Sequence, residues 1–172
     1  MTPTLNTKRL VLRPLKKATL RQVDWLHDPK VLQYSEQRHA VHSLATQRHY
    51  ITHQPAGSYV WAIHLVDDDY HIGNLTAVAD RPNGVADLAI LIGERACWGL
   101  GYATEAFDTT TGWLLGPAGG NFRKVEAGCM SANAAMKKVL NKAGYALEGE
   151  RRNHYLLGDG QLAGMLLYGR VR

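Results

Sequence analysis

The spacing of hydrophobic and polar residues predicts the order of the elements along the chain. Residues 8–14 alternate basic and apolar side chains, which is typical of a strand, whereas residues 18–27 place Leu20, Val23 and Leu26 on one side of a helix. Asp28 and Pro29 then end that helix. The full predicted order is a strand at 8–14, helices at 18–27 and in two short pieces within 30–54, strands at 58–66, 70–78 and 85–93, a helix that follows Gly99 and Gly101 and ends near Gly116, a strand at 122–130, a helix at 132–144, and strands at 145–157 and 163–170.

Turn and capping residues separate these elements. Ser43 or Thr46 is the expected N-cap of the second helical piece, and Gly144 follows the helix at 132–144 as its C′ residue. Aspartates 67–69 are expected to form a hairpin turn. The order predicts an α/β fold with a mixed, largely antiparallel sheet and one βαβ crossover. No linker or repeat divides the chain, so we expect one domain over residues 1–172.

Charge and composition exclude little. The 20 Lys and Arg against 15 Asp and Glu give a net charge of +5, and the basic residues are spread along the chain. Nucleic-acid binding through the short basic clusters stays open as an alternative, but no aromatic-rich basic stripe supports it, so none is expected. A small polyanionic ligand would explain the same excess.

The sequence indicates neither a membrane segment nor a disulfide framework. No apolar run approaches the roughly 20 residues that span a bilayer, and the first residues lack the apolar core of a signal peptide. We therefore expect a cytoplasmic protein with no membrane partner. Cys97 and Cys129 fit a reducing compartment and have no spacing for a disulfide framework or a zinc site.

Two glycines precede the long predicted helix, in the stretch "WGLGYATEAF". A helix N-terminus exposes unpaired N–H groups with a partial positive charge, and Gly99 and Gly101 would let a ligand approach that backbone closely. This arrangement predicts an anion site, commonly for phosphate. The alternative is a tight turn with no ligand. Neither the Rossmann fingerprint nor the P-loop is met, because a third glycine and a Gly-Lys-Ser/Thr sequence are missing.

The same stretch carries a resemblance to a known family. "LAILIGERACWGLGYATEA" resembles the central motif of the GNAT N-acetyltransferases, in the branch of the ribosomal-protein alanine and diamine acetyltransferases. A second match, "SANAAMKKVLNKAGYALEGERR", follows at the family's spacing, and "TKRLVLRPL" fits the family's opening. The resemblance covers nearly the whole chain and implies a GNAT-type fold whose central parallel strands splay apart, flanked by helices.

The resemblance also implies a cosubstrate, acetyl-CoA, and the residues that hold it. The strand end would pair with the pantetheine arm, the glycine loop would hold the pyrophosphate, and Asn133 would bond the pantetheine or the departing thiol, besides being a natural N-cap. The acetyl group would pass directly to a primary amine in a ternary complex. The implied cofactor-binding residues are Leu91, Ile92, Gly93, Trp98, Gly99, Leu100, Gly101, Tyr102, Ala103, Asn133 and Lys138.

Proton transfer is where the sequence departs from the family. Met136 and Leu140 stand where relatives often carry a serine or tyrosine acid, and Ala163 stands where relatives often carry an aspartate. The carboxylates Glu94 and Glu148 are candidate catalytic bases, and Asp87 and His154 are further candidates near the strand ends. These departures leave a non-catalytic CoA-binding or regulatory module open as the alternative function.

The acceptor is expected to be a small-molecule amine or a protein N-terminus. Segments 30–57 and 150–165 would shape its site, and a homodimer is expected because relatives are often dimers. No metal is expected. His49 and His53 stand four residues apart, but no carboxylate or cysteine completes a metal site with them, and the three aspartates do not match an EF-hand loop.

Overall fold

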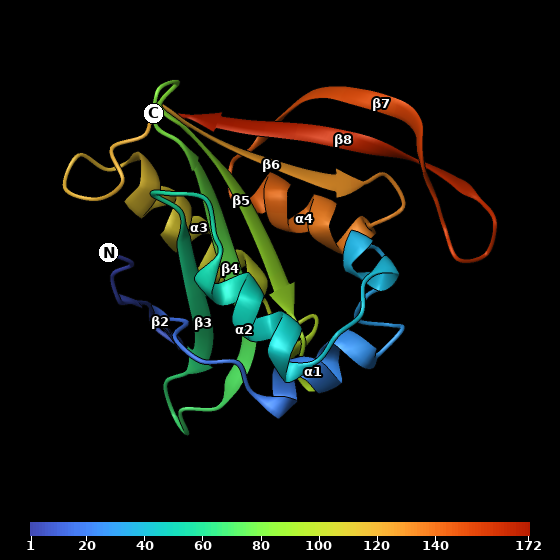
Figure 1. The fold of residues 1–172 in the computed structure, drawn as a ribbon. Coiled ribbons are helices and arrows are strands. Elements are labelled where there is room, and N and C mark those ends of the chain that lie inside the picture. The colour runs from blue at the N-terminus through green and yellow to red at the C-terminus, as the bar shows by residue number, and fades with distance from the viewer.

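A computed structural model describes all residues from Met1 to Arg172. Eight strands form one sheet in the order β1-β2-β3-β4-β5-β6-β8-β7, in which only β5 and β6 are parallel (Figure 1). The strands are β1 (Leu5–Asn6), β2 (Leu10–Pro14), β3 (Tyr59–Leu65), β4 (His71–Asp80), β5 (Val85–Ile92), β6 (Lys124–Met130), β7 (Ala146–Leu156) and β8 (Leu162–Val171). The helices are α1 (Leu20–His27), α2 (Leu44–Thr52), α3 (Tyr102–Leu115) and α4 (Ala134–Lys142), with 3₁₀ turns at Glu36–His39 and Arg95–Cys97.

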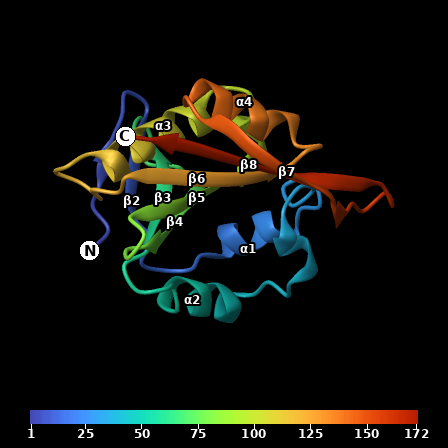
Figure 2. The same ribbon diagram turned by 90° about the horizontal axis from the view of Figure 1, so that it is seen from above.

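The helices lie on opposite faces of the sheet. Figure 2 shows α3 and α4 on one face and α1 and α2 on the other. The main core lies under α3 and α4, where Leu114 and Leu140 pack with Ala86 and Leu88 of β5. Successive strand residues point to opposite faces, so the residue between them, Asp87, faces the α1 and α2 side. The face under α3 and α4 is called the cofactor face below, and the other the acceptor face, after the roles that the family resemblance leads us to expect for them.

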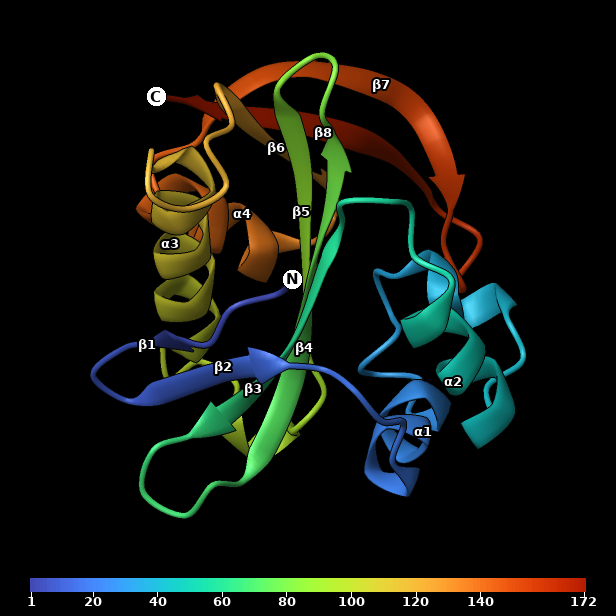
Figure 3. The same cartoon turned by 60° about the vertical axis from the view of Figure 1, so that its left-hand side comes forward.

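The two parallel strands separate after a short contact. Pairing between β5 and β6 covers only Val85 with Lys124, Ala86 with Val125, and Asp87 with Glu126. Beyond these pairs the strands diverge, as Figures 1 and 3 show, and the far half of β5 has no neighbour on that edge. The opening is called the splay. The expected splayed parallel strands are confirmed.

The structure confirms the predicted order of elements and corrects some bounds. Of the two helical pieces predicted within 30–54, the first is the 3₁₀ turn Glu36–His39 and the second is α2. Strand β1 and the 3₁₀ turn at Arg95–Cys97 were not predicted, because segments of two or three residues carry too little periodicity. The long helix begins at Tyr102, directly after the two glycines as predicted, because Gly99 and Gly101 both adopt positive φ and cannot continue a right-handed helix. Ser43, not Thr46, is the N-cap of α2.

Candidate active site

The loop before α3 has the backbone conformation that its glycines suggested. Gly99 has φ of 76° and Gly101 has φ of 85°, both in the left-handed region that side chains disfavour. Gly101 is the N-cap of α3 and provides no capping side chain. Trp98 and Leu100 flank these glycines and are exposed. The chain therefore turns sharply into α3 and leaves the end of that helix open.

The N–H groups of this turn have no acceptor in the protein. The Trp98 N–H donates to Arg95 O at 3.1 Å, and the next bonded N–H along the chain is that of Glu105, which donates to Gly101 O at 3.1 Å. The six N–H groups of residues 99–104 between them are unpaired. Because they gather at the positive end of the helix dipole, they form a site for an anion such as a phosphate.

The free edge of β5 lies next to this loop. The Gly93 N–H donates to Ile72 O of β4 at 3.0 Å, and N–H groups alternate between the two edges of a strand. The backbone of Leu91 therefore faces β4 as well, while that of Ile92 faces the splay. The Trp98 indole N–H donates to Ile92 O at 2.8 Å, which holds the loop against the strand.

Two of the predicted strand-end residues have their side chains on the acceptor face. Leu91 packs against the small cluster of Trp25, Leu26, Val31 and Leu32. A Cβ at Gly93 would overlap the Trp25 ring, so this glycine is required by packing against α1. Leu91 and Gly93 therefore join α1 to the end of β5, and Ile92 is the residue of the three whose backbone faces the splay.

Asn133 lies at the start of α4, on the other side of the splay. Its Oδ1 accepts from the Met136 N–H at 3.0 Å as the N-cap, while its amide NH₂ has no partner and is free to donate. Met136 packs on the main core and Leu140 is fully buried. Neither side chain carries an ionisable proton, so neither can act as the acid. Lys138 is exposed on the helix surface.

The candidate bases differ in whether their carboxylates already have hydrogen-bond or ion-pair partners. Glu94 is bound by the Tyr70 hydroxyl at 3.1 Å and caps the 3₁₀ turn after β5. Glu148 pairs with Lys124 at 2.7 Å, and Lys124 also holds Glu126 at 2.8 Å. Both candidates are therefore engaged in structural contacts.

Asp87 has neither a hydrogen bond nor an ion pair and lies at the closed end of the splay, on the acceptor face. Although its side chain is accessible, its pKa is raised, first by desolvation and then by the negative charge of Glu126, which faces it across the parallel pair. A raised pKa brings a carboxylate closer to the range in which it can accept a proton at neutral pH.

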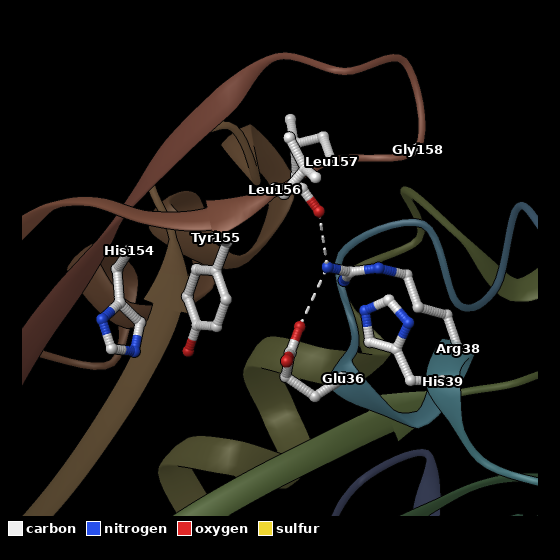
Figure 4. Close-up of a pocket in the computed structure, with 8 residues that line it drawn as sticks. All are labelled: Glu36, Arg38, His39, His154, Tyr155, Leu156, Leu157 and Gly158. Atoms are coloured by element: carbon white, nitrogen blue, oxygen red, sulfur yellow. Dashed lines mark hydrogen bonds and ion pairs between the residues drawn. The ribbon is translucent and has the colours of Figure 1, made fainter.

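Two adjoining cavities open on the acceptor face. One of about 350 Å³ includes His154 and Tyr155 of β7 with His39, and the other, of about 650 Å³, extends along the end of α1 and the β7–β8 loop. Arg38 borders both. Its guanidinium bonds Glu36 at 2.9 Å and Leu156 O at 3.1 Å, which joins the segment after α1 to β7 (Figure 4).

The predicted acceptor segments, 30–57 and 150–165, thus supply much of these cavities. His154, one of the candidate bases, lines the smaller cavity and lies 4.7 Å from the Tyr155 ring centroid. Arg38 and Glu126 were missed by sequence reasoning. Neither belongs to a motif, and each acquires its place only through contacts with distant strands.

Other candidate chemistries find no support in the side chains. Desolvation raises the pKa of both Cys97 and Cys129, so neither thiol is activated as an acyl carrier. The His49 and His53 rings stack with centroids 3.8 Å apart, and no group of three or more His, Cys, Asp or Glu has the arrangement of a metal site. No helix combines the length and the apolar character that crossing a membrane requires.

Comparisons with known proteins agree with this geometry. The family described as "Acetyltransferase (GNAT) domain" matches residues 9–146. No curated protein matches the chain by sequence.

Solved structures with the same fold include a GNAT acetyltransferase from Bacillus anthracis at 16% identity, TM-score 0.79, covering 98% of both chains. RimL, a ribosomal L7/L12 α-N-protein acetyltransferase solved with coenzyme A, has 17% identity and TM-score 0.79 over 98% of both chains. Spermidine N-acetyltransferase from Vibrio cholerae, solved with CoA and spermine, has 15% identity and TM-score 0.81 over 96% of both chains. With a family match over most of its length, the chain belongs to the GNAT acetyltransferase family.

Proposed function

We propose that this protein is an acetyl-CoA-dependent N-acetyltransferase that transfers the acetyl group directly to a primary amine in a ternary complex. The observation that carries the proposal is the row of six unpaired N–H groups at the start of α3, opened by Gly99 and Gly101. Backbone N–H groups at a helix start bind a pyrophosphate without any charged side chain. RimL and the spermidine acetyltransferase, which share the fold, were both solved with CoA.

The splay provides the rest of the cosubstrate site. The Ile92 N–H faces the opening from β5, and Asn133, whose amide has no partner, lies at the start of α4 across the opening. These groups would align the pantetheine arm and the acetyl carbonyl, while Lys138 is available for the adenosine phosphates. Acetyl-CoA supplies an activated acetyl group, and the protein's contribution is to hold it beside the amine.

Asp87 is the carboxylate that we assign to accept the proton of the amine. It faces the acceptor side at the closed end of the splay, and its pKa is raised, whereas Glu94 and Glu148 are held by Tyr70 and Lys124. Attack of the neutral amine forms the new C–N bond as the C–S bond breaks, and the thiolate leaves without an acid from Met136 or Leu140. A thiol with a pKa of about 8.5 makes that departure feasible.

The acceptor would enter from the two cavities on the acceptor face, between the segment after α1 and the β7–β8 hairpin. A small-molecule amine and a protein N-terminus are both compatible with openings of this size. The two structural relatives each act on one of these acceptor types: RimL is named for a protein N-terminus and the Vibrio cholerae enzyme for spermidine.

The experiment is thiol release from acetyl-CoA against a panel of polyamines, amino sugars and peptide N-termini. The proposal expects release that depends on both acetyl-CoA and one acceptor class. The second candidate function, a non-catalytic CoA-binding module, rests on the buried Leu140 and the core-packed Met136 in place of a proton donor. Binding of acetyl-CoA with no release on any amine would favour that alternative.

A further inference from the structure

Arg9, just before β2, reaches across to the open end of α3. Its Nε donates to Glu105 Oε2 at 2.7 Å and its Nη1 donates to Leu100 O at 2.9 Å. The guanidinium lies 4.5 Å from the centroid of the Tyr102 ring. Its remaining Nη2 has no hydrogen bond and lies 3.4 Å from where a Cβ on Gly101 would be. One side chain from the start of the chain therefore contacts both the loop before α3, at Leu100 and Gly101, and the first turn of the helix, at Tyr102 and Glu105.

Glu105 creates an electrostatic problem that Arg9 addresses. It lies in the first turn of α3, where its negative charge interacts favourably with the helix dipole but repels any anion bound at the same end. Desolvation alone would raise its pKa, but hydrogen bonds from Thr7 and from the side chain and backbone of Arg9 outweigh this and lower it. Glu105 is thus ionised at neutral pH, and a fixed positive charge is needed to cancel it.

The Leu100 carbonyl is the second point of control. It belongs to the turn whose N–H groups are unpaired, and a carbonyl oxygen pointing into that turn would repel a phosphate. The bond from Arg9 Nη1 engages this oxygen and points it toward the segment before β2.

We propose that Arg9 is a positioning residue for the pyrophosphate turn: it cancels the charge of Glu105 and fixes the Leu100 carbonyl, which keeps the turn able to accept an anion. The inference rests on the proposed function, because it assigns that turn to the pyrophosphate of acetyl-CoA. It adds a residue that lies about 90 positions before the turn in the sequence.

The test compares acetyl-CoA with S-acetyl-pantetheine, which carries the thioester but no pyrophosphate. In Arg9→Met, kcat/KM with acetyl-CoA should fall about ten-fold, because a charged hydrogen bond is lost and a like charge is exposed. The kcat/KM with S-acetyl-pantetheine should stay unchanged. Arg9→Lys, which keeps the charge but not the two-pronged contact, should fall between Arg9→Met and wild type.

A double variant distinguishes an electrostatic role of Arg9 from a role in stabilising the fold. If Arg9 cancels Glu105, adding Glu105→Gln to Arg9→Met should recover most of the lost acetyl-CoA activity, although it removes a further contact of the network. Arg13→Met is the matched control, since Arg13 lies four residues further along in β2, pairs with Asp69 and is as exposed (43% against 41%). It should change neither activity.

Equal losses with both cosubstrates, or no recovery in the double variant, would mean that Arg9 only stabilises the fold and would overturn the inference. Failure of the proposed function looks different, because the wild-type protein itself would then neither bind nor use acetyl-CoA. Calorimetric affinities for CoA, measured for the same variants, give the comparison without depending on turnover.

Discussion

Three helices of this protein begin on a capping side chain, and α3 does not. Thr19, Ser43 and Asn133 accept from N–H groups in the first turns of α1, α2 and α4 at 3.3, 3.1 and 3.0 Å. Gly101 begins α3 with φ of 85° and no cap. In the longest helix, no side chain accepts from the first-turn N–H groups, whereas each of its three neighbours has one of these groups capped.

The contrast is what the proposed cosubstrate site requires, because a helix end that binds a ligand must leave its N–H groups open. A side-chain cap is worth about 1 kcal/mol to a helix, so a chain selected only for stability would use one on α3 as well. The glycine instead leaves the six N–H groups open, and Arg9 supports the turn from outside. Asn133 is intermediate, because it caps α4 with its oxygen and keeps its amide free.

The largest expected effect comes from closing the turn itself. Gly101→Val should weaken acetyl-CoA binding by about three orders of magnitude, because a branched side chain disfavours φ near 85° and removes access to several N–H donors. Calorimetry measures the affinity. Gly160→Val is the matched control, since Gly160 has φ of 82° and no neighbour near its Cβ position but lies in the β7–β8 turn. Equal affinity of the two variants for acetyl-CoA would contradict a specific role of Gly101 in binding.

Removing the proposed base on the acceptor face should lower turnover but leave acetyl-CoA binding intact. Asp87→Asn should lower kcat about 100-fold, since a general base typically contributes at least that much, while the affinity for acetyl-CoA stays unchanged. Stopped assays at saturating acetyl-CoA measure this. Glu148→Gln is the control, because Glu148 also lies on this face but pairs with Lys124. A variant of Asp87 with wild-type kcat would remove it from the proton path.

Asp87 also predicts a pH dependence of stability. Its pKa in the folded protein is raised above the ordinary value of 3.8, so the charged form is disfavoured by folding. Its contribution is fully present below pH 3.8 and is lost as the pH rises through the folded pKa. Asp87→Asn should therefore melt at a higher temperature than wild type at pH 7, and the difference should shrink toward pH 3. A difference that grew on acidification would contradict the raised pKa.

A smaller effect should divide the two roles of Asn133. Asn133→Asp keeps an oxygen for the N-cap but loses the free amide, so stability should hold while kcat/KM falls about ten-fold. Asn133→Ala should lose about 1 kcal/mol of stability as well. Thermal melts beside steady-state kinetics separate the two. Equal activity of the aspartate variant and wild type would leave Asn133 with its capping role alone.

The smallest effect is expected at an ordinary cap. Ser43→Ala should cost about 1 kcal/mol of unfolding free energy and leave acetyl-CoA affinity unchanged, because α2 presents no open N-terminus. Urea unfolding with parallel calorimetry measures both quantities. An affinity change in this variant would blur the contrast between α2 and α3.

Much of the fold was predictable because its signals are local. Periodicity placed the strands and helices, Ser43 and Asn133 marked helix starts, and Gly99 and Gly101 marked the open turn. These features depend on neighbours within a few residues, which a sequence shows directly. The splay followed from the family resemblance, since nothing local says where two parallel strands stop pairing.

The roles of several residues could not be predicted, because they depend on contacts between distant segments. Trp98 fixes the loop through its indole N–H on Ile92 O, and Gly93 leaves room for the Trp25 ring. Arg9 meets Glu105 across 96 positions. The sequence shows a strand arginine at position 9, and only the fold shows what that arginine holds.

A calorimetric titration of the wild-type protein with acetyl-CoA, repeated in the presence of inorganic pyrophosphate, tests whether the open end of α3 holds the cosubstrate. We expect saturable binding of one acetyl-CoA per chain, weakened by pyrophosphate because both occupy the open end of α3. Absence of binding, or binding that pyrophosphate leaves unchanged, would contradict the assignment of that helix end as the cosubstrate site.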